Sequence, residues 1–223
     1  MKFKLILGFL LVLIGCSGNL KTSEGKLAVE DSPNTHFKSN IGLKIEYKPT
    51  RGQTYTDTIG NKYNLRHIPA IITNDSSIPI QIHIAFLKEY DYPITYTDKQ
   101  FKVFPMPKEW ALDGVEITNE TLNELPTYID NPFLNKTLAP GEKWLLAFGT
   151  LCPKDINYGV FPVAIFSHDH RDLSHECKYL INPDKLTIPH LALELLIGFT
   201  SGSQASPDSC MTIPCGKISY TEH

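Results

Sequence analysis

A period of two in the apolar residues points to strands rather than helices in this chain. Between residues 78 and 86 every second residue is isoleucine or phenylalanine, and the intervening residues are Pro79, Gln81, His83 and Ala85. Successive side chains of a β-strand point to opposite faces, so this run predicts a strand with one buried face. Residues 41–48 repeat the period with Ile41, Leu43, Ile45 and Tyr47. Both segments are therefore predicted to lie in a sheet that covers an apolar core.

Further strands are predicted wherever short β-branched or aromatic runs are bounded by turn residues. Residues 65–73 form such a run, and the turn-forming sequence Asn74-Asp75-Ser76-Ser77 follows it, so we expect a hairpin with residues 78–86. Residues 188–199 alternate as in a strand but contain helix-forming Leu, Ala and Glu, and we favour a strand because the alternation is unbroken. The remaining predicted strands are residues 100–104, 115–118, 143–151, 160–167, 177–181 and 212–220.

This pattern predicts an all-β fold, an antiparallel sandwich with a long insert at residues 88–136. Within the insert, Thr121-Leu122-Asn123-Glu124 fits a capping box, and Pro126 is expected to end that short helix within about two turns. The segments 71–80 and 138–161, with their Asn-Asp-Ser-Ser and Ala-Pro-Gly-Glu turns, resemble those of bacterial immunoglobulin-like domains. The resemblance implies an immunoglobulin-like β-sandwich.

The first sixteen residues have the order of features of an export signal. Lys2 and Lys4 precede an apolar run that is too short to span a bilayer, and Gly15 and Cys16 follow it. The sequence Leu-Ile-Gly-Cys at residues 13–16 resembles the lipobox of bacterial lipoproteins. The resemblance implies that residues 1–15 are a signal peptide and that the Cys16 sulfur is lipidated and held in a membrane of the cell envelope. Ser17 in place of an aspartate implies the outer membrane if the host is Gram-negative.

The predicted domain organisation follows from composition. Residues 16–40 are rich in Ser, Thr, Asn, Lys and Gly with few large apolar residues, and we expect a lipidated flexible tether. Residues 41–223 are expected to form the β-sandwich domain. Without the signal the chain has 19 basic and 24 acidic residues, and no cluster of basic residues suits nucleic acid. The expected partners are the membrane, through the lipid, and an envelope protein or glycan.

Four cysteines besides Cys16 form an even set in a chain that the signal sends to an oxidising compartment. We therefore predict that Cys152, Cys177, Cys210 and Cys215 form disulfides. Three pairings are possible, and the closest in sequence joins Cys210 to Cys215 and leaves Cys152 for Cys177. A zinc site is the less favoured alternative, because the sequence has no C-x-x-C spacing.

Histidines concentrate in one short stretch, at His168, His170 and His175. The first two would share a face of a strand, so a metal site of three imidazoles is geometrically possible, but a solvated hairpin tip is the simpler interpretation and no metal or other cofactor is expected. Aromatic rings in the insert, among them Tyr90, Tyr96 and Trp110, could stack on a sugar or peptide or cover the core.

The sequence therefore favours a membrane-anchored, non-enzymatic binding or assembly module whose ligand it does not identify. The G-x-S-x-G motif of serine hydrolases does not occur, and the single S-x-x-K sequence, from Ser23 to Lys26, lies in the predicted tether rather than in the predicted β-sandwich. The alternatives are a metal-assisted hydrolase that uses His168, His170 and His175, and an inhibitor of host hydrolases.

Overall fold

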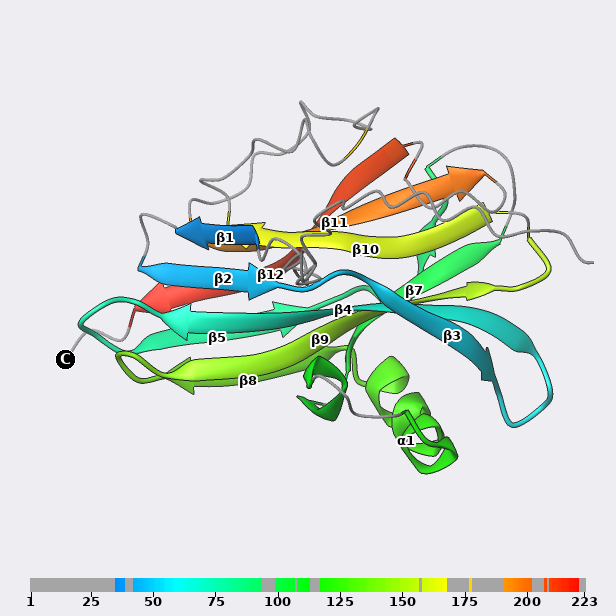
Figure 1. Ribbon diagram of the computed structural model, residues 1–223, viewed down its shortest axis with the longest axis horizontal. Coiled ribbons are helices and arrows are strands. Elements are labelled where there is room, and N and C mark those ends of the chain that lie inside the picture. The colour runs from blue at the N-terminus through cyan, green and yellow to red at the C-terminus, as the bar shows by residue number, and fades with distance from the viewer. Residues whose placement is uncertain are drawn as a thin grey trace, which may run out of the picture. The chain divides into compact units, whose positions relative to one another are not determined.

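The chain folds into two antiparallel sheets (Figure 1). In this computed structural model the described residues are 35–38, 42–93, 99–106, 108–112, 117–156, 158–167, 177, 191–201, 207 and 209–220. The elements are β1 (Thr35–Lys38), β2 (Leu43–Tyr47), β3 (Arg51–Thr56), β4 (Lys62–Asn74), β5 (Ile80–Ala85), β6 (Tyr90–Asp91), β7 (Gln100–Met106), η1 (Lys108–Ala111), α1 (Asn119–Asp130), β8 (Phe133–Leu138), β9 (Lys143–Pro153), β10 (Tyr158–Ser167), β11 (Ala192–Ser201) and β12 (Ser209–Tyr220). The all-β antiparallel sandwich predicted from the alternation is confirmed.

The strand order places β4 and β9 at the centre of one sheet and β11 and β12 inside the other. The seven-stranded sheet has the order β1-β2-β4-β9-β7-β6, and β3 also pairs with β4. The five-stranded sheet has the order β10-β11-β12-β5-β8. The alternation predicted for residues 78–86 is observed in β5, where buried and exposed residues alternate strictly.

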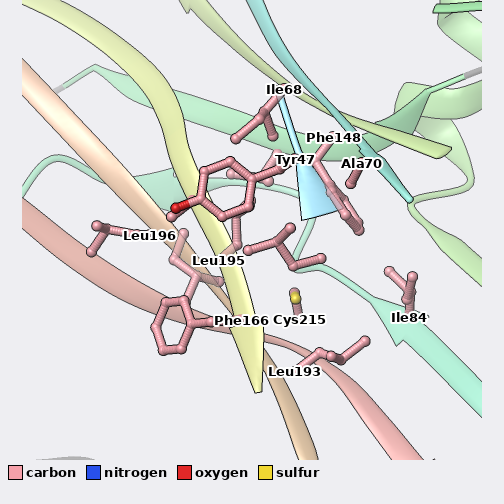
Figure 2. Packing of buried hydrophobic residues seen from close by; sticks show 14 of the residues in the cluster. Tyr47, Ile68, Ala70, Ile84, Phe148, Phe166, Leu193, Leu195, Leu196 and Cys215 are labelled. Carbon is pink, nitrogen blue, oxygen red and sulfur yellow. The ribbon is translucent and has the colours of Figure 1, made fainter. Parts of the chain in front are cut away.

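The main core lies between the two sheets. It contains Ile45 of β2, Ile68 of β4, Phe148 of β9 and Leu195 of β11, all fully buried. Figure 2 shows apolar side chains from both sheets packed together, with the sulfur of Cys215 among them. Burying a side chain of this size contributes about 1.5 to 3 kcal/mol, so this cluster is the main source of stability.

A second apolar cluster lies on the other face of the seven-stranded sheet, under η1 and α1. Its sheet residues include Leu65 of β4 and Phe104 of β7, and its helical residues include Trp110 of η1 and Leu125 of α1. In Figure 1, α1 lies on the opposite side of β4 and β9 from β10 and β11. The insert therefore covers a sheet face that would otherwise expose apolar side chains.

The connection from β4 to β5 is not the predicted hairpin. The two strands lie in different sheets, because β4 pairs with β2, β3 and β9 whereas β5 pairs with β12 and β8. Fully buried Asn74 holds the crossing: its Nδ2 donates to the Ile78 oxygen at 2.8 Å and the Leu138 oxygen at 2.9 Å. Its Oδ1 accepts from the backbone N–H of Ser76 at 2.9 Å and from the Ser76 hydroxyl at 2.7 Å. The hydrogen bond from Asn74 to Leu138 of β8 ties this turn to the five-stranded sheet, so the chain crosses from one sheet to the other instead of folding back on β4.

The predicted helix exists, but both of its ends differ from the prediction. Thr118 is the N-cap of α1, and Thr121 occupies the third helical position of the capping box rather than the cap itself. Pro126 lies inside the helix, which continues to Asp130. The proline removes one backbone hydrogen bond, but Leu125 is fully buried, and Tyr128 and Ile129 pack against the second cluster. Tertiary packing thus keeps the last turn helical.

Other predicted strands differ in their extent. β11 confirms that the ambiguous run at residues 188–199 is a strand from Ala192 onward. β1 lies inside residues 16–40, which the composition predicts to be a tether. Its backbone pairs with β2, and composition does not reveal such a pairing. Of the strand predicted at residues 115–118, Thr118 caps α1 and residues 115–116 lie outside the described residues, as do residues 178–181.

Candidate functional site

The β3–β4 hairpin ends in a turn that a single carboxylate organises. Asp57 Oδ1 accepts the backbone N–H groups of Ile59 at 3.0 Å and Asn61 at 2.8 Å. Asp57 Oδ2 accepts from Asn61 Nδ2 at 3.0 Å and from the Tyr63 hydroxyl at 3.3 Å. Gly60 has a φ of +91°, a conformation that other L residues rarely adopt. Desolvation alone would raise the pKa of Asp57, but the hydrogen bonds from Asn61, Ile59 and Tyr63 outweigh it and hold that pKa below its ordinary value.

The turn between β9 and β10 lies beside this hairpin. The Lys154 backbone N–H donates to the Lys62 oxygen at 3.0 Å, and Lys154 Nζ donates to the Thr54 hydroxyl at 3.0 Å. Lys99 Nζ donates to Asp155 Oδ2 at 3.0 Å, and this hydrogen bond is the main cause that lowers the pKa of Asp155. The carboxylates of Asp57 and Asp155 therefore both carry negative charge at neutral pH.

These two turns enclose an open depression of about 570 Å³, which we call the loop-end depression. Its lining combines ammonium and carboxylate groups with one aromatic ring, that of Tyr63. The lining residues are Gly60, Asn61, Lys62, Tyr63, Lys99, Pro153, Lys154 and Asp155. Such a surface presents hydrogen-bond donors and acceptors that are already oriented, and it suits a polar ligand.

A second polar cluster is buried under η1. His67 of β4 is 1 % exposed and its ring meets that of Trp110 edge to face, with centroids 5.2 Å apart. Neither ring nitrogen of His67 has a hydrogen-bond partner among the described residues, nor do Trp110 Nε1 and Gln53 Nε2. Burial lowers the pKa of His67 from 6.5 to about 4, and the positive charge of Arg51 adds to the shift.

The cysteines pair differently from the neighbour pairing of the sequence. Cys177 and Cys210 form a disulfide with a Cα separation of 5.9 Å, whereas Cys152 and Cys215 are free and buried. Pairing Cys210 with Cys215 is wrong because both lie on β12, where five residues of extended chain separate their Cα atoms by roughly 16 Å. A disulfide requires Cα atoms less than about 7 Å apart. Only one of the expected disulfides is therefore present.

We expect the two free thiols to be unreactive in the folded protein. Burial is the main cause that raises the pKa of Cys152 and of Cys215, and the Glu194 carboxylate raises that of Cys215 further. Because the thiolate is the reactive form, N-ethylmaleimide should modify neither cysteine until the chain unfolds. Intact mass should then show two adducts, and reduction of the unfolded chain should add two more. Rapid modification of either thiol in the native protein would contradict this burial.

The other sites predicted from sequence fall into two groups. Cys16, His168, His170 and His175 lie outside the described residues. Within the insert, Phe101, Phe104 and Trp110 are each at most 2 % exposed, so these aromatic rings cover the cores rather than form a stacking surface. The described residues contain no group of three or more His, Cys, Asp or Glu side chains placed to hold a metal ion.

No local sequence pattern identifies the loop-end depression as a whole. The sequence Asp57-Thr58-Ile59-Gly60-Asn61 has the composition of a tight turn and could have located the hairpin. Lys99 and Asp155 are 56 residues apart, so no local pattern relates them. His67 lies in the strand sequence of residues 65–73 and belongs to no recognisable motif, so the sequence does not mark it as a functional residue.

The described part of the chain thus defines a class: an antiparallel β-sandwich with a helical insert on one sheet and a charged depression between two turns. Comparisons with family models, with curated proteins and with solved structures found no match. No helix among the described residues is long and apolar enough to cross a membrane.

Proposed function

We propose that this protein is a bacterial lipoprotein whose β-sandwich binds a partner in the cell envelope through the loop-end depression, without catalysing a reaction. The signal-like residues 1–15 and Cys16 support the anchor. As a flexible coil, residues 16–34 would span roughly 25 Å and let the body reach partners near the membrane.

The observation that carries the binding role is the fixed charge arrangement around the depression. The carboxylate of Asp57 accepts four hydrogen bonds, and that of Asp155 is paired with Lys99. General acid or base catalysis is most effective when the pKa of the group lies near the working pH, and both of these pKa values are lowered. Asp57 therefore fixes the hairpin turn beside the depression, and Asp155, which lines the depression, is better suited to orient a ligand than to transfer protons.

The chemistry of the lining favours a polar partner, a glycan or a hydrophilic protein surface. Lys62 and Lys154 supply ammonium donors, and Asp155 supplies acceptors. Tyr63 adds a partly buried ring on which a sugar could pack.

A site-specific crosslinking experiment tests this proposal. A photoreactive amino acid placed at Lys62 of the full chain in its native host should give a covalent adduct with an envelope glycan or protein. The matched control carries the same amino acid at Lys217, which is also an exposed lysine but lies on β12 of the other sheet. The double change Lys62→Glu and Lys154→Glu should reduce binding of the adducted partner about tenfold or more, since charged hydrogen bonds contribute about 1.5 to 3 kcal/mol. Equal adduct formation at Lys217 would contradict a binding role for the depression.

A further inference from the structure

The contact between His67 of β4 and Trp110 of η1 buries polar atoms that have no hydrogen-bond partner among the described residues. His67 and Trp110 are 1 % and 2 % exposed, and their ring nitrogens have no hydrogen-bond partner among the described residues. Gln53 Nε2 on the adjacent strand is buried in the same condition. A buried polar group without a partner costs about 1 to 3 kcal/mol, so the closed position of η1 is held against a substantial opposing cost.

The sheet beneath η1 cannot move to relieve this cost. His67 lies in β4, which pairs with β3 through Arg51 and with β9 through Gly149 at this position. η1 is a single short 3-10 helix with Trp110 and Ala111 buried against the sheet. One hydrogen bond, from Arg51 Nη1 to the Leu112 oxygen at 3.1 Å, connects the end of η1 to β3. η1 is therefore the side of this contact that can separate.

We propose that η1 is an acid-released cap: a proton taken up by His67 detaches η1 from the sheet and exposes Trp110 to solvent. An imidazolium has only donors, and neither ring nitrogen of His67 finds an acceptor among the described residues. The new charge would also lie near Arg51, which already disfavours the protonated ring. Lifting η1 admits water to both groups.

The charged groups that the structure describes around η1 do not compensate a proton on His67. η1 itself carries Lys108 and Glu109, and on α1 the charge of Glu124 acts with that of Glu109 on Tyr128. The stretches of β7 and β9 that pair here, residues 104–106 and 147–149, contain no charged side chain, and the nearest charged residue of β7 along the strand is Lys102. Among the described residues, Arg51 is the group whose charge acts on His67.

The size of the expected response follows from the two protonation equilibria. His67 has a pKa of about 4 under the cap and would return to the ordinary value of 6.5 when exposed. This difference corresponds to an increase of about 100-fold in the opening equilibrium between neutral pH and pH 4, and of at most about 300-fold at still lower pH. Closure is complete above the exposed value and is lost as the pH falls below it.

Trp110 is a convenient reporter, because the chain has only one other tryptophan, Trp144. In a full-length Trp144→Phe variant, indole emission and iodide quenching should show Trp110 becoming exposed between pH 6.5 and pH 4. Far-UV circular dichroism should stay unchanged over the same range, because the sheets remain paired. The transition should disappear in His67→Phe and in His67→Gln, two variants that cannot be protonated at this position.

Three results would overturn the proposal. The first is a Trp110 that stays protected to pH 4, and the second is an unchanged transition in either His67 variant. The third is loss of the strand signal together with exposure of Trp110, which would mean global unfolding. If neither His67 variant folds, the comparison of fluorescence with circular dichroism in the Trp144→Phe protein still decides the question.

Discussion

Replacing Cys16 by serine is expected to abolish acylation of the chain. The sulfur of Cys16 is the proposed site of the thioether to the lipid, and a hydroxyl at this position cannot replace it. A single acyl chain gives only marginal membrane binding, whereas two or more give stable anchoring, at about 0.8 kcal/mol for each buried methylene. We therefore expect an all-or-none loss of anchoring through the lipid rather than a graded one.

Metabolic labelling with a tagged fatty acid and mass spectrometry of the mature N-terminus would measure this effect. The native protein should begin with acylated Cys16, and the Cys16→Ser chain should carry no label. Ser17→Ala is the matched control and should retain full labelling, since it leaves the sulfur in place. A labelled Cys16→Ser chain, or an unmodified Cys16 thiol in the native protein, would remove the basis for the envelope assignment.

Asn74→Ala should be among the most destabilising single substitutions in the sandwich. The change removes both Nδ2 hydrogen bonds: the Leu138 oxygen loses this donor in a buried position, whereas the partly buried Ile78 oxygen keeps the Ser76 hydroxyl as a donor. It also removes the acceptor of Ser76, which positions the crossing from β4 to β5. We expect the free energy of unfolding to fall by about 3 to 5 kcal/mol, because buried polar groups that lose their partners cost about 1 to 3 kcal/mol each.

Urea unfolding of the purified protein, followed by circular dichroism, would measure the change. Asn135→Ala is the matched control: its side chain is exposed and contacts His83, so its effect should stay within about 0.5 kcal/mol. Asn74→Asp separates the donor role of the Asn74 side chain from its acceptor role. It keeps the acceptor for Ser76 but turns a donor into an anion that faces two carbonyl oxygens, and it should be at least as destabilising as alanine. Equal stability of the Asn74→Ala and Asn135→Ala proteins would contradict the role of this crossing.

The local chemistry of the sequence predicted the strands better than their partners. The period of two located β5 and β2, and unbroken alternation identified β11 despite its helix-forming residues. The same reasoning placed β4 and β5 in one hairpin, because a turn sequence alone does not reveal that Asn74 bonds to Leu138, 64 residues away. Pro126 was expected to end α1 for a similar reason, since packing of the last turn is not encoded near the proline.

The candidate site was predictable only in part. The turn around Asp57 follows from residue types that favour tight turns, but the depression also needs Lys99 and Asp155, which the fold brings together from distant positions. The buried environment of His67 depends on Trp110 of η1, 43 residues further along the chain. Because Lys99 and Asp155, and likewise His67 and Trp110, are far apart in the sequence, no local pattern predicts either contact.

By itself, the sequence determined that this chain is built of strands and which of their faces are apolar, because alternation and turn formation depend on residues within a few positions of one another. Only the tertiary structure decided which strands share a sheet, that Cys177 pairs with Cys210, and that η1 covers His67. These outcomes depend on contacts between distant segments, whose free energies compete across the whole chain and leave no local pattern.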